Sequence, residues 1–241
     1  MMLLVFTDRT TLLSALPPGL TGAEIGTAGG DFAQAILDRS APARLHLIDP
    51  YRFIDSPDYL PDMSNVDDAE GERRFRFVQD RFAIPIASGQ VALHRAASPK
   101  IAAQFGDDYF DYVYIDGNHT QSAVAADLDA FDRKVKPEGL IMGHDYVAHP
   151  DAKALNFGVV EAVNAFVKKT GCEFLMLTYE GAPSFILAKN RGSPLAQRLV
   201  SAVLSSMIPA VAILKAEDKV MGQWDVCNEQ GERMRTLLAF R

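Results

Sequence analysis

The stretch AEIGTAGGDFA, residues 23–33, decides the fold of this chain. A strand ends at Glu24 and Ile25, glycines stand at positions 26, 29 and 30, and a helical pattern begins immediately afterwards. Glycine has no Cβ, so a turn of this composition lets a ligand approach the backbone where the helix begins. The stretch therefore predicts a strand-turn-helix unit that can hold a nucleotide-like ligand.

The rest of the chain repeats this alternation of strands and helices, which indicates βαβ units around a mostly parallel sheet. The sequence EGAP separates the last two strand-like runs and is short enough for a hairpin, which makes one strand antiparallel. Seven strands are expected, at 22–26, 43–49, 91–98, 108–116 and 139–145, and in two runs within 172–189.

The fold class expected is α/β, with the sheet in one domain of residues 21–190. Residues 1–20 predict a short helical lead-in that ends at LPPG, and residues 191–241 predict a helical extension. The helix after the fourth strand has an apolar stripe of Val124, Leu128, Phe131 and Val135, and its aspartates at 127, 129 and 132 are expected on the polar side.

Residues 199–216 are apolar over nearly the length of a membrane span. Three serines, Pro209 and Lys215 weaken that interpretation and favour a buried or partner-facing helix pair. We therefore expect no membrane contact, and a homo-oligomer contact through residues 195–216.

The composition favours a globular protein with a small-molecule partner. The 241 residues are 48% hydrophobic and 23% charged, and the net charge of −7 argues against a nucleic-acid surface, because phosphate binding relies on clustered Lys and Arg. The start MMLLVF is short, has no basic flank and meets Asp8 at once, unlike a secretory signal. Two cysteines, Cys172 and Cys227, form no disulfide or zinc pattern, which is typical of the cytoplasm.

Polar residues follow two strands that should be neighbours in the sheet. Asp116 ends one strand in YIDGNH, and His144 and Asp145 end the next in GHDY. Because the carboxyl ends of parallel strands meet at one edge, we expect these side chains to converge. Two carboxylates with water and a substrate hydroxyl suit Mg²⁺, although Asp116 could instead contact a cofactor.

Two cofactor classes fit the glycine-rich turn. Asp49 ends the second strand 23 residues past Gly26, where an acid binds ribose hydroxyls in nucleotide-binding α/β folds. An NAD-dependent oxidoreductase would need Gly-x-Gly-x-x-Gly, but the second glycine position holds Ala28, and no Tyr-x-x-x-Lys pair follows the fourth strand. A cofactor-binding or assembly protein without catalysis is a third alternative.

Glu24, Gly26 and Gly30 form Glu-x-Gly-x-x-x-Gly, which resembles the first motif of class I S-adenosylmethionine methyltransferases. The Ile-Asp-Gly-x-His strand end, the Pro-x-Gly turn and the Gly-His-Asp-Tyr strand end resemble a bacterial group within that class, over about residues 20–190. The layout is similar to metal-dependent O-methyltransferases that act on antibiotic sugars and, more distantly, to catechol O-methyltransferase.

The resemblance implies a Rossmann-like sheet with strand order 3-2-1-4-5-7-6 and S-adenosylmethionine as cofactor. It implies metal carboxylates at Asp116 and Asp145, a catalytic group at His119, where catechol enzymes have a lysine, and Tyr146 in place of an asparagine ligand. Ser98 falls where this fold meets adenine. The cofactor residues expected are Glu24, Gly26, Thr27, Gly30, Asp31, Phe32, Asp49, Ser98 and Asp116.

These residues suggest how a methyl group could move to a hydroxyl of a small polar molecule, such as a sugar or secondary metabolite. Methyl transfer is an in-line displacement, so the acceptor oxygen must be positioned and must lose a proton. His119, with an ordinary pKa near 6.5, is the expected base. His144 is a second base or a packed residue, and His119 could instead cap the following helix. His46 and His94, inside predicted strands, are expected to be structural.

Overall fold

In the part of the chain that the structure describes, residues 1–214 and 221–240, nine strands form one mixed sheet in the order β4-β3-β2-β5-β6-β8-β7-β1-β9. The structure is a computed structural model. The strands are β1 Met2–Val5, β2 Thr21–Ile25, β3 Arg44–Asp49, β4 Val91–Arg95, β5 Phe110–Ile115, β6 Val135–Gly143, β7 Glu173–Thr178, β8 Phe185–Ala188 and β9 Ala210–Ile213.

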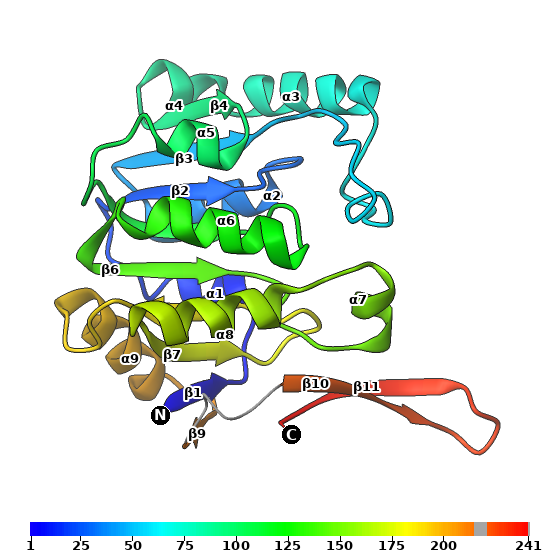
Figure 1. Cartoon of the computed structure of the whole chain (residues 1–241). Helices are drawn as coiled ribbons and strands as arrows, with labels where there is room; N and C mark the ends of the chain where they lie inside the picture. The colour runs from blue at the N-terminus through cyan, green and yellow to red at the C-terminus, as the bar shows by residue number, and fades with distance from the viewer. Residues whose placement is uncertain (215–220, 241) are drawn as a thin grey trace.

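Helices cover both faces of this sheet (Figure 1). Apolar residues of α5, α6 and α8 pack on one face, and those of α1, α2, α3 and α9 pack on the other. The helices are α1 Arg9–Leu13, α2 Asp31–Ser40, α3 Asp68–Arg81, α4 Ala83–Ala87, α5 Ser98–Ala102, α6 Gln121–Asp132, α7 Pro150–Ala154, α8 Val159–Thr170 and α9 Pro194–Ser205.

The predicted central sheet is confirmed. Strands β4, β3, β2, β5 and β6 are parallel, and β8 runs antiparallel between β6 and β7. These seven strands reproduce the expected order 3-2-1-4-5-7-6. The predicted stripe of α6 is buried at Val124, Leu128 and Phe131, but Val135 is the first residue of β6. Parallel strands side by side place their carboxyl ends, and the residues that follow them, at one edge.

The N-terminal segment is more than a helical lead-in. β1 pairs parallel with β7 and extends the sheet, and only the five residues of α1 are helical. Asp8 caps α1 by accepting a hydrogen bond from the backbone of Thr11. The loop after β3 also continues into α3 and α4, to which the sequence pattern gave no assignment.

The C-terminal extension, expected to be helical, is helical only in α9. After α9 the chain forms β9, which pairs antiparallel with β1, and then the hairpin of β10, Met221–Cys227, and β11, Arg233–Phe240. Pro209 follows the end of α9, and its carbonyl accepts a hydrogen bond from Phe6, so the apolar run after it joins the sheet edge. The predicted helix pair at 199–216 is therefore one helix end and one strand, and residues 215 and 216 lie outside the described residues.

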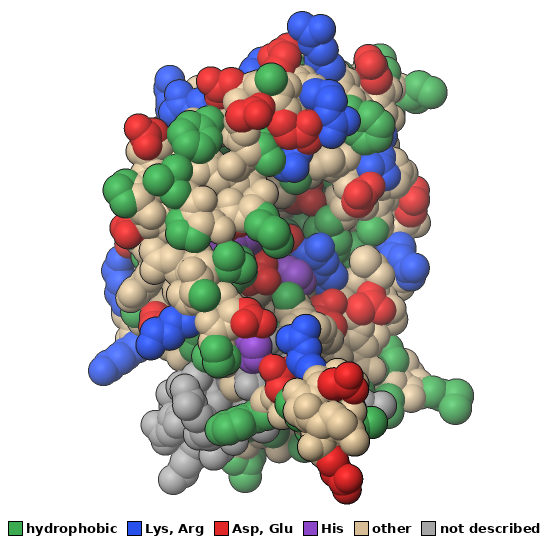
Figure 2. All heavy atoms as spheres, turned by 90° about the vertical axis from the view of Figure 1, so that its right-hand side faces the viewer, with side chains coloured by type: hydrophobic (Ala, Val, Ile, Leu, Met, Phe, Trp, Pro, Cys, Tyr) green, Lys and Arg blue, Asp and Glu red, His purple; other side chains and the backbone are tan. Residues whose placement is uncertain are grey.

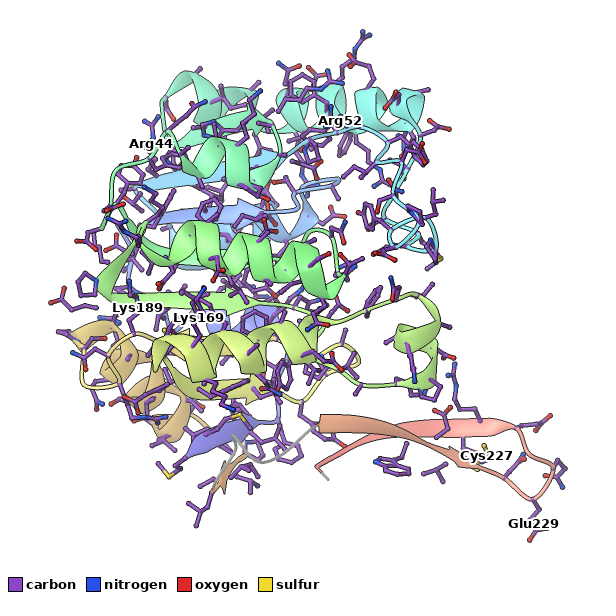
Figure 3. The ribbon with its side chains drawn as sticks, viewed as in Figure 1. Arg44, Arg52, Lys169, Lys189, Cys227 and Glu229 are labelled. Carbon is purple, nitrogen blue, oxygen red and sulfur yellow. The ribbon has the colours of Figure 1, made fainter. Side chains whose placement is uncertain are left out.

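The C-terminal hairpin projects from the body of the molecule, with Cys227 and Glu229 at its outer end (Figure 3). One bridge between Ala148 and Gly222 joins it to the loop before α7. Among the described residues, no helix is long and apolar enough to cross a membrane. Val211 and Leu214, within the segment expected to contact a second copy, are exposed, and that contact stays a prediction.

Candidate active site

A cavity of about 240 Å³ opens at the carboxyl ends of β2, β3, β4 and β5. Figure 2 looks onto this edge of the sheet, where histidine and acidic side chains gather in a hollow. Its lining includes Gly26, Asp49, Ser98, Asp116 and Asp127. Four of these are residues that the sequence pattern selected, and they come from four separate strand ends or the helices that follow.

The glycine-rich turn brings two strand ends into contact. Gly26 has φ +89°, and a Cβ there would lie 2.0 Å from the carbonyl oxygen of Asp116. Gly30, the N-cap of α2, has φ +77°, and its Cβ would lie 2.7 Å from the ring of Phe82. No side chain fits at either position, and the backbone of Gly26 borders the cavity directly.

Asp49 ties the turn to the end of β3. Its Oδ1 accepts a hydrogen bond from the backbone of Tyr51 at 2.7 Å, and its Oδ2 accepts one from the backbone of Ala28 at 2.9 Å. Ala28 and Tyr51 both have positive φ, at 45° and 49°. Burial raises the pKa of Asp49, and the two backbone donors oppose that rise. Two strained residues therefore hold this carboxylate at the cavity wall.

Glu24 is buried in front of the turn with an unsatisfied carboxylate. The residue is 2% exposed, and its Oε2 has no hydrogen-bond partner among the described residues. Burial and the charge of Asp116 raise the pKa of Glu24 well above its usual range. Thr27 Oγ1 is also buried without a partner in this part of the chain. Neither residue is among those that line the cavity, and the Thr27 hydroxyl lies close enough to Glu24 to lower its pKa. A cationic amino group fits the buried Glu24 carboxylate, because it would supply a donor and a charge.

Asp31 and Phe32, two of the predicted cofactor residues that do not line the cavity, make other contacts. The Asp31 side chain is 91% exposed and pairs with Arg81 at 2.5 Å, because the first residue of α2 points to solvent. Phe32 is buried between Tyr114 and the guanidinium of Arg9, 4.4 Å from its ring centroid, so it belongs to the core. Asp31 and Phe32 do not line the cavity, and cofactor contact by these two residues stays a prediction.

The ends of β5 and β6 converge as predicted. Asp145 Oδ2 lies 3.2 Å from His119 Nε2 and 3.0 Å from His144 Nδ1. Asp116 Oδ1 lies 3.6 Å from His119 Nε2 and 3.7 Å from His144 Nδ1. The other oxygen of Asp116 pairs with Arg9 at 2.5 Å. Two aspartates, two histidines and one arginine therefore form a single charged cluster beside the cavity.

His119 is held by a third carboxylate. Its Nδ1 lies 2.7 Å from Oδ2 of Asp62, which is 6% exposed and belongs to the loop after β3. Burial alone would lower the pKa of His119, but the carboxylates of Asp116, Asp145 and Asp62 outweigh burial and raise it to about 12. The carboxylates therefore hold the pKa of His119 well above the ordinary histidine value. The imidazole is protonated at neutral pH unless another cation offsets these acids.

The cluster includes a set of groups that could hold a metal ion. Ligand atoms of Asp116, His144 and Asp145 all lie within 4.8 Å of one another. Asp145 has φ +57°, a strained conformation for a residue with a side chain. Tyr146 takes no part, because its hydroxyl donates to Asn164 at 2.8 Å. Two carboxylates and an imidazole fit a divalent cation, and the imidazole extends the range from Mg²⁺ to Mn²⁺, Fe²⁺ and Zn²⁺.

Three residues at the site were missed by the sequence pattern: Arg9, Asp62 and Asp127. Asp127 was expected on the polar face of α6, but it is 5% exposed and accepts a hydrogen bond from Ser98. Its position three residues after Val124 and four before Phe131, at the edge of the apolar stripe, was the available signal. Nothing local distinguishes Arg9 or Asp62, because both reach the site through the packing of distant segments.

A family model described as a methyltransferase domain matches residues 23–146, just over half of the chain. The match begins in β2 and ends after β6, so it includes the glycine-rich turn and both polar strand ends. The chain belongs to this methyltransferase domain family. The family implies S-adenosylmethionine as the methyl donor, which agrees with the orphaned acceptors of Glu24 and Thr27.

Solved structures share the fold of this methyltransferase at low identity. A chain of the complex between the Haloferax volcanii Trm112 methyltransferase activator and a methyltransferase has a TM-score of 0.52 and 13% identity, over 74% of this chain and 87% of that chain. A protein from Bordetella parapertussis has a TM-score of 0.51 and 15% identity, over 74% of this chain and 64% of its own length. The pyocyanin biosynthetic protein PhzM has a TM-score of 0.50 and 13% identity, over 72% of this chain and 51% of its own. No curated protein sequence matches the methyltransferase.

Proposed function

We propose that this methyltransferase transfers the methyl group of S-adenosylmethionine to a hydroxyl of a small polar molecule. A divalent cation would bind at Asp116, His144 and Asp145, and His119 would accept the proton of the hydroxyl. The observation that carries the proposal is the approach of Asp116, Asp145 and His119 within 3.6 Å beside the cavity of the glycine-rich turn.

The cofactor would lie along the cavity. The backbone at Gly26 allows close approach, and Asp49 stands where ribose hydroxyls are bound in nucleotide-binding α/β folds. Glu24 and Thr27 have buried acceptors without partners among the described residues, which suits the amino group of the methionine part. The methyl group would then face the end of β5, where Asp116 borders both the cavity and the charged cluster.

The charged cluster would prepare the acceptor. When bound, a divalent cation supplies Lewis acidity that lowers the pKa of a coordinated hydroxyl. Its charge would also offset the carboxylates of Asp116 and Asp145, which now hold the pKa of His119 high. Asp62 accepts from Nδ1, so it would leave Nε2 as the atom of His119 that takes the proton.

The family assignment favours S-adenosylmethionine over NAD and an enzyme over an assembly protein. Calorimetric titration with S-adenosylmethionine and with NAD, each with Mn²⁺, Mg²⁺ or EDTA, tests the cofactor and the cation. A panel of hydroxylated acceptors, assayed with His119→Ala, tests the chemistry. We expect S-adenosylmethionine alone to bind, and His119→Ala to lose turnover while it keeps cofactor affinity. Binding of NAD, or full turnover by the variant, would contradict the proposal.

A further inference from the structure

We infer that Asp127, held by Ser98, recognises the 6-amino group of the cofactor's adenine and makes the methyltransferase selective for adenosine over inosine. The inference rests on S-adenosylmethionine as the cofactor, but it does not depend on the acceptor or on a metal. It concerns a residue outside the charged cluster and at a different part of the cavity wall.

Asp127 is a buried acid that no described residue neutralises. It is 5% exposed, and no ion pair joins it to a lysine or arginine whose side chain the structure describes. Ser98 donates a hydrogen bond to its Oδ1, and the residue lines the cavity. Burying a carboxylate without a cation costs free energy. Burial accordingly raises the pKa of Asp127 to about 6, although the hydrogen bond from Ser98 opposes that rise. A fold keeps such a group most readily where a ligand completes its hydrogen bonds.

Asp127 lies in the part of the cavity wall that the adenine would reach if the ribose of the cofactor lies at Asp49. Asp49 borders the cavity at the end of β3, where the ribose is expected. The lining that follows comes from Ala97, from the start of α5 and from α6, and it is apolar apart from the Ser98 hydroxyl and the Asp127 carboxyl. The residues of this part of the wall are Ala97, Ser98, Pro99, Ala123, Ala126 and Asp127.

The chemistry of the pair distinguishes adenine from hypoxanthine. Adenine carries an amino group at its 6 position, which donates hydrogen bonds, whereas hypoxanthine carries a carbonyl there, which only accepts. With Oδ1 occupied by Ser98, Oδ2 of an ionised Asp127 would accept from the 6-amino group. The same oxygen would face an acceptor in inosine, with no donor between them. Hydrogen bonds to a charged group are worth roughly tenfold to a hundredfold in affinity.

The experiment is calorimetric titration of the full-length protein with S-adenosylhomocysteine and S-inosylhomocysteine. The variants are Asp127→Asn and Ser98→Ala, with Asp129→Asn as the matched control, because Asp129 lies on the same helix but is exposed and pairs with Lys169. We expect the unmodified protein and Asp129→Asn to prefer the adenosine compound at least tenfold. Asp127→Asn should bind that compound at least tenfold more weakly and lose the preference, because its amide can donate to the hypoxanthine carbonyl.

Each other outcome has a definite meaning. If Asp127→Asn keeps the preference for the adenosine compound, or binds both compounds more weakly by the same factor, the inference is wrong and Asp127 is structural. Thermal unfolding of each variant in the absence of ligand shows whether it is folded, and Ser98→Ala supplies a second test if Asp127→Asn does not fold. If the unmodified protein binds neither compound, the cofactor assignment fails and this inference fails with it.

Discussion

Asp62 Oδ2 lies 2.7 Å from His119 Nδ1, although 57 residues separate the two in the chain. The contact brings the loop after β3 onto the end of β5 and fixes the imidazole with Nε2 toward Asp145. The segment after α7 contacts both the loop and His119. Asn156 donates a hydrogen bond to the backbone carbonyl of Asp58 at 3.0 Å, and the ring of Phe157 lies 4.4 Å from that of His119. The loop is therefore part of the active site.

Asp62→Asn should lower kcat for methyl transfer by about tenfold or more, because an amide nitrogen opposite Nδ1 disfavours the orientation of His119. The KM for S-adenosylmethionine should change by less than about threefold, because Asp62 does not line the cavity. Steady-state kinetics with both substrates measures the split. Asp58→Asn is the control, because Asp58 is exposed and engages the site only through its backbone. Equal kcat in the two variants would remove Asp62 from the mechanism.

Gly26→Ala should abolish cofactor binding and destabilise the fold by about 2 kcal/mol or more, because its Cβ would meet the backbone of Asp116 and φ is +89°. Gly29→Ala in the same turn should leave both properties nearly unchanged, since nothing lies within 4 Å of its Cβ. Titration with S-adenosylhomocysteine and urea unfolding of the two variants measure the difference. A tolerated alanine at position 26 would mean that the turn is not held against β5.

His144→Ala should weaken Mn²⁺ binding at least tenfold, because it removes one of the three groups that could hold the ion. Affinity for S-adenosylhomocysteine should be unchanged. His149→Ala serves as the control, because His149 faces Asp151 and Asp225 outside that set. Electron paramagnetic resonance of free Mn²⁺ measures the binding. Equal Mn²⁺ affinity in the two variants would exclude His144 as a ligand.

Asp127→Asn should stabilise the protein without ligand at neutral pH. The folded state raises the pKa of Asp127 from 3.8 to about 6, so its stabilising effect is present below pH 3.8 and is lost as the pH rises through 6. The increase in the free energy of unfolding caused by Asp127→Asn is therefore expected above pH 6, at up to about 3 kcal/mol, and it should shrink at pH 4. Urea unfolding at both pH values tests this. A gain that is equal at pH 4 and pH 7.5 would contradict the shifted pKa.

The neutral pair His46 and His94 should make stability fall in weak acid. His46 Nδ1 lies 2.9 Å from His94 Nε2, and burial lowers the pKa of His46 from 6.5 to about 4 and also lowers that of His94. Their contribution is present above pH 6.5 and is lost as the pH falls toward 4, because the unfolded chain then binds more protons. The unfolding midpoint should fall between these values more steeply than in His46→Gln. If the unfolding midpoints of the unmodified protein and of His46→Gln fall equally with pH, other groups control the pH dependence of stability.

The sequence alone determined the central sheet and one edge of it. Alternating apolar patterns specify βαβ units, and right-handed parallel connections leave few arrangements of seven strands. Because parallel strands end at the same edge, the convergence of Asp116 and Asp145 could be predicted from their place in the chain. The glycines at 26 and 30 were predictable for a local reason, since their positive φ is a property of the turn itself.

Only the tertiary structure decided how the site is completed and charged. Arg9 comes from a segment added to the sheet through β1, and Asp62 comes from a loop with no periodic pattern. The pKa of His119 follows from three carboxylates that surround one buried ring, which no local sequence rule contains. Local patterns fix the backbone through short-range sterics and hydrophobic spacing. Ion pairs and buried charges depend on which distant segments pack together, and that is settled only when the whole chain folds.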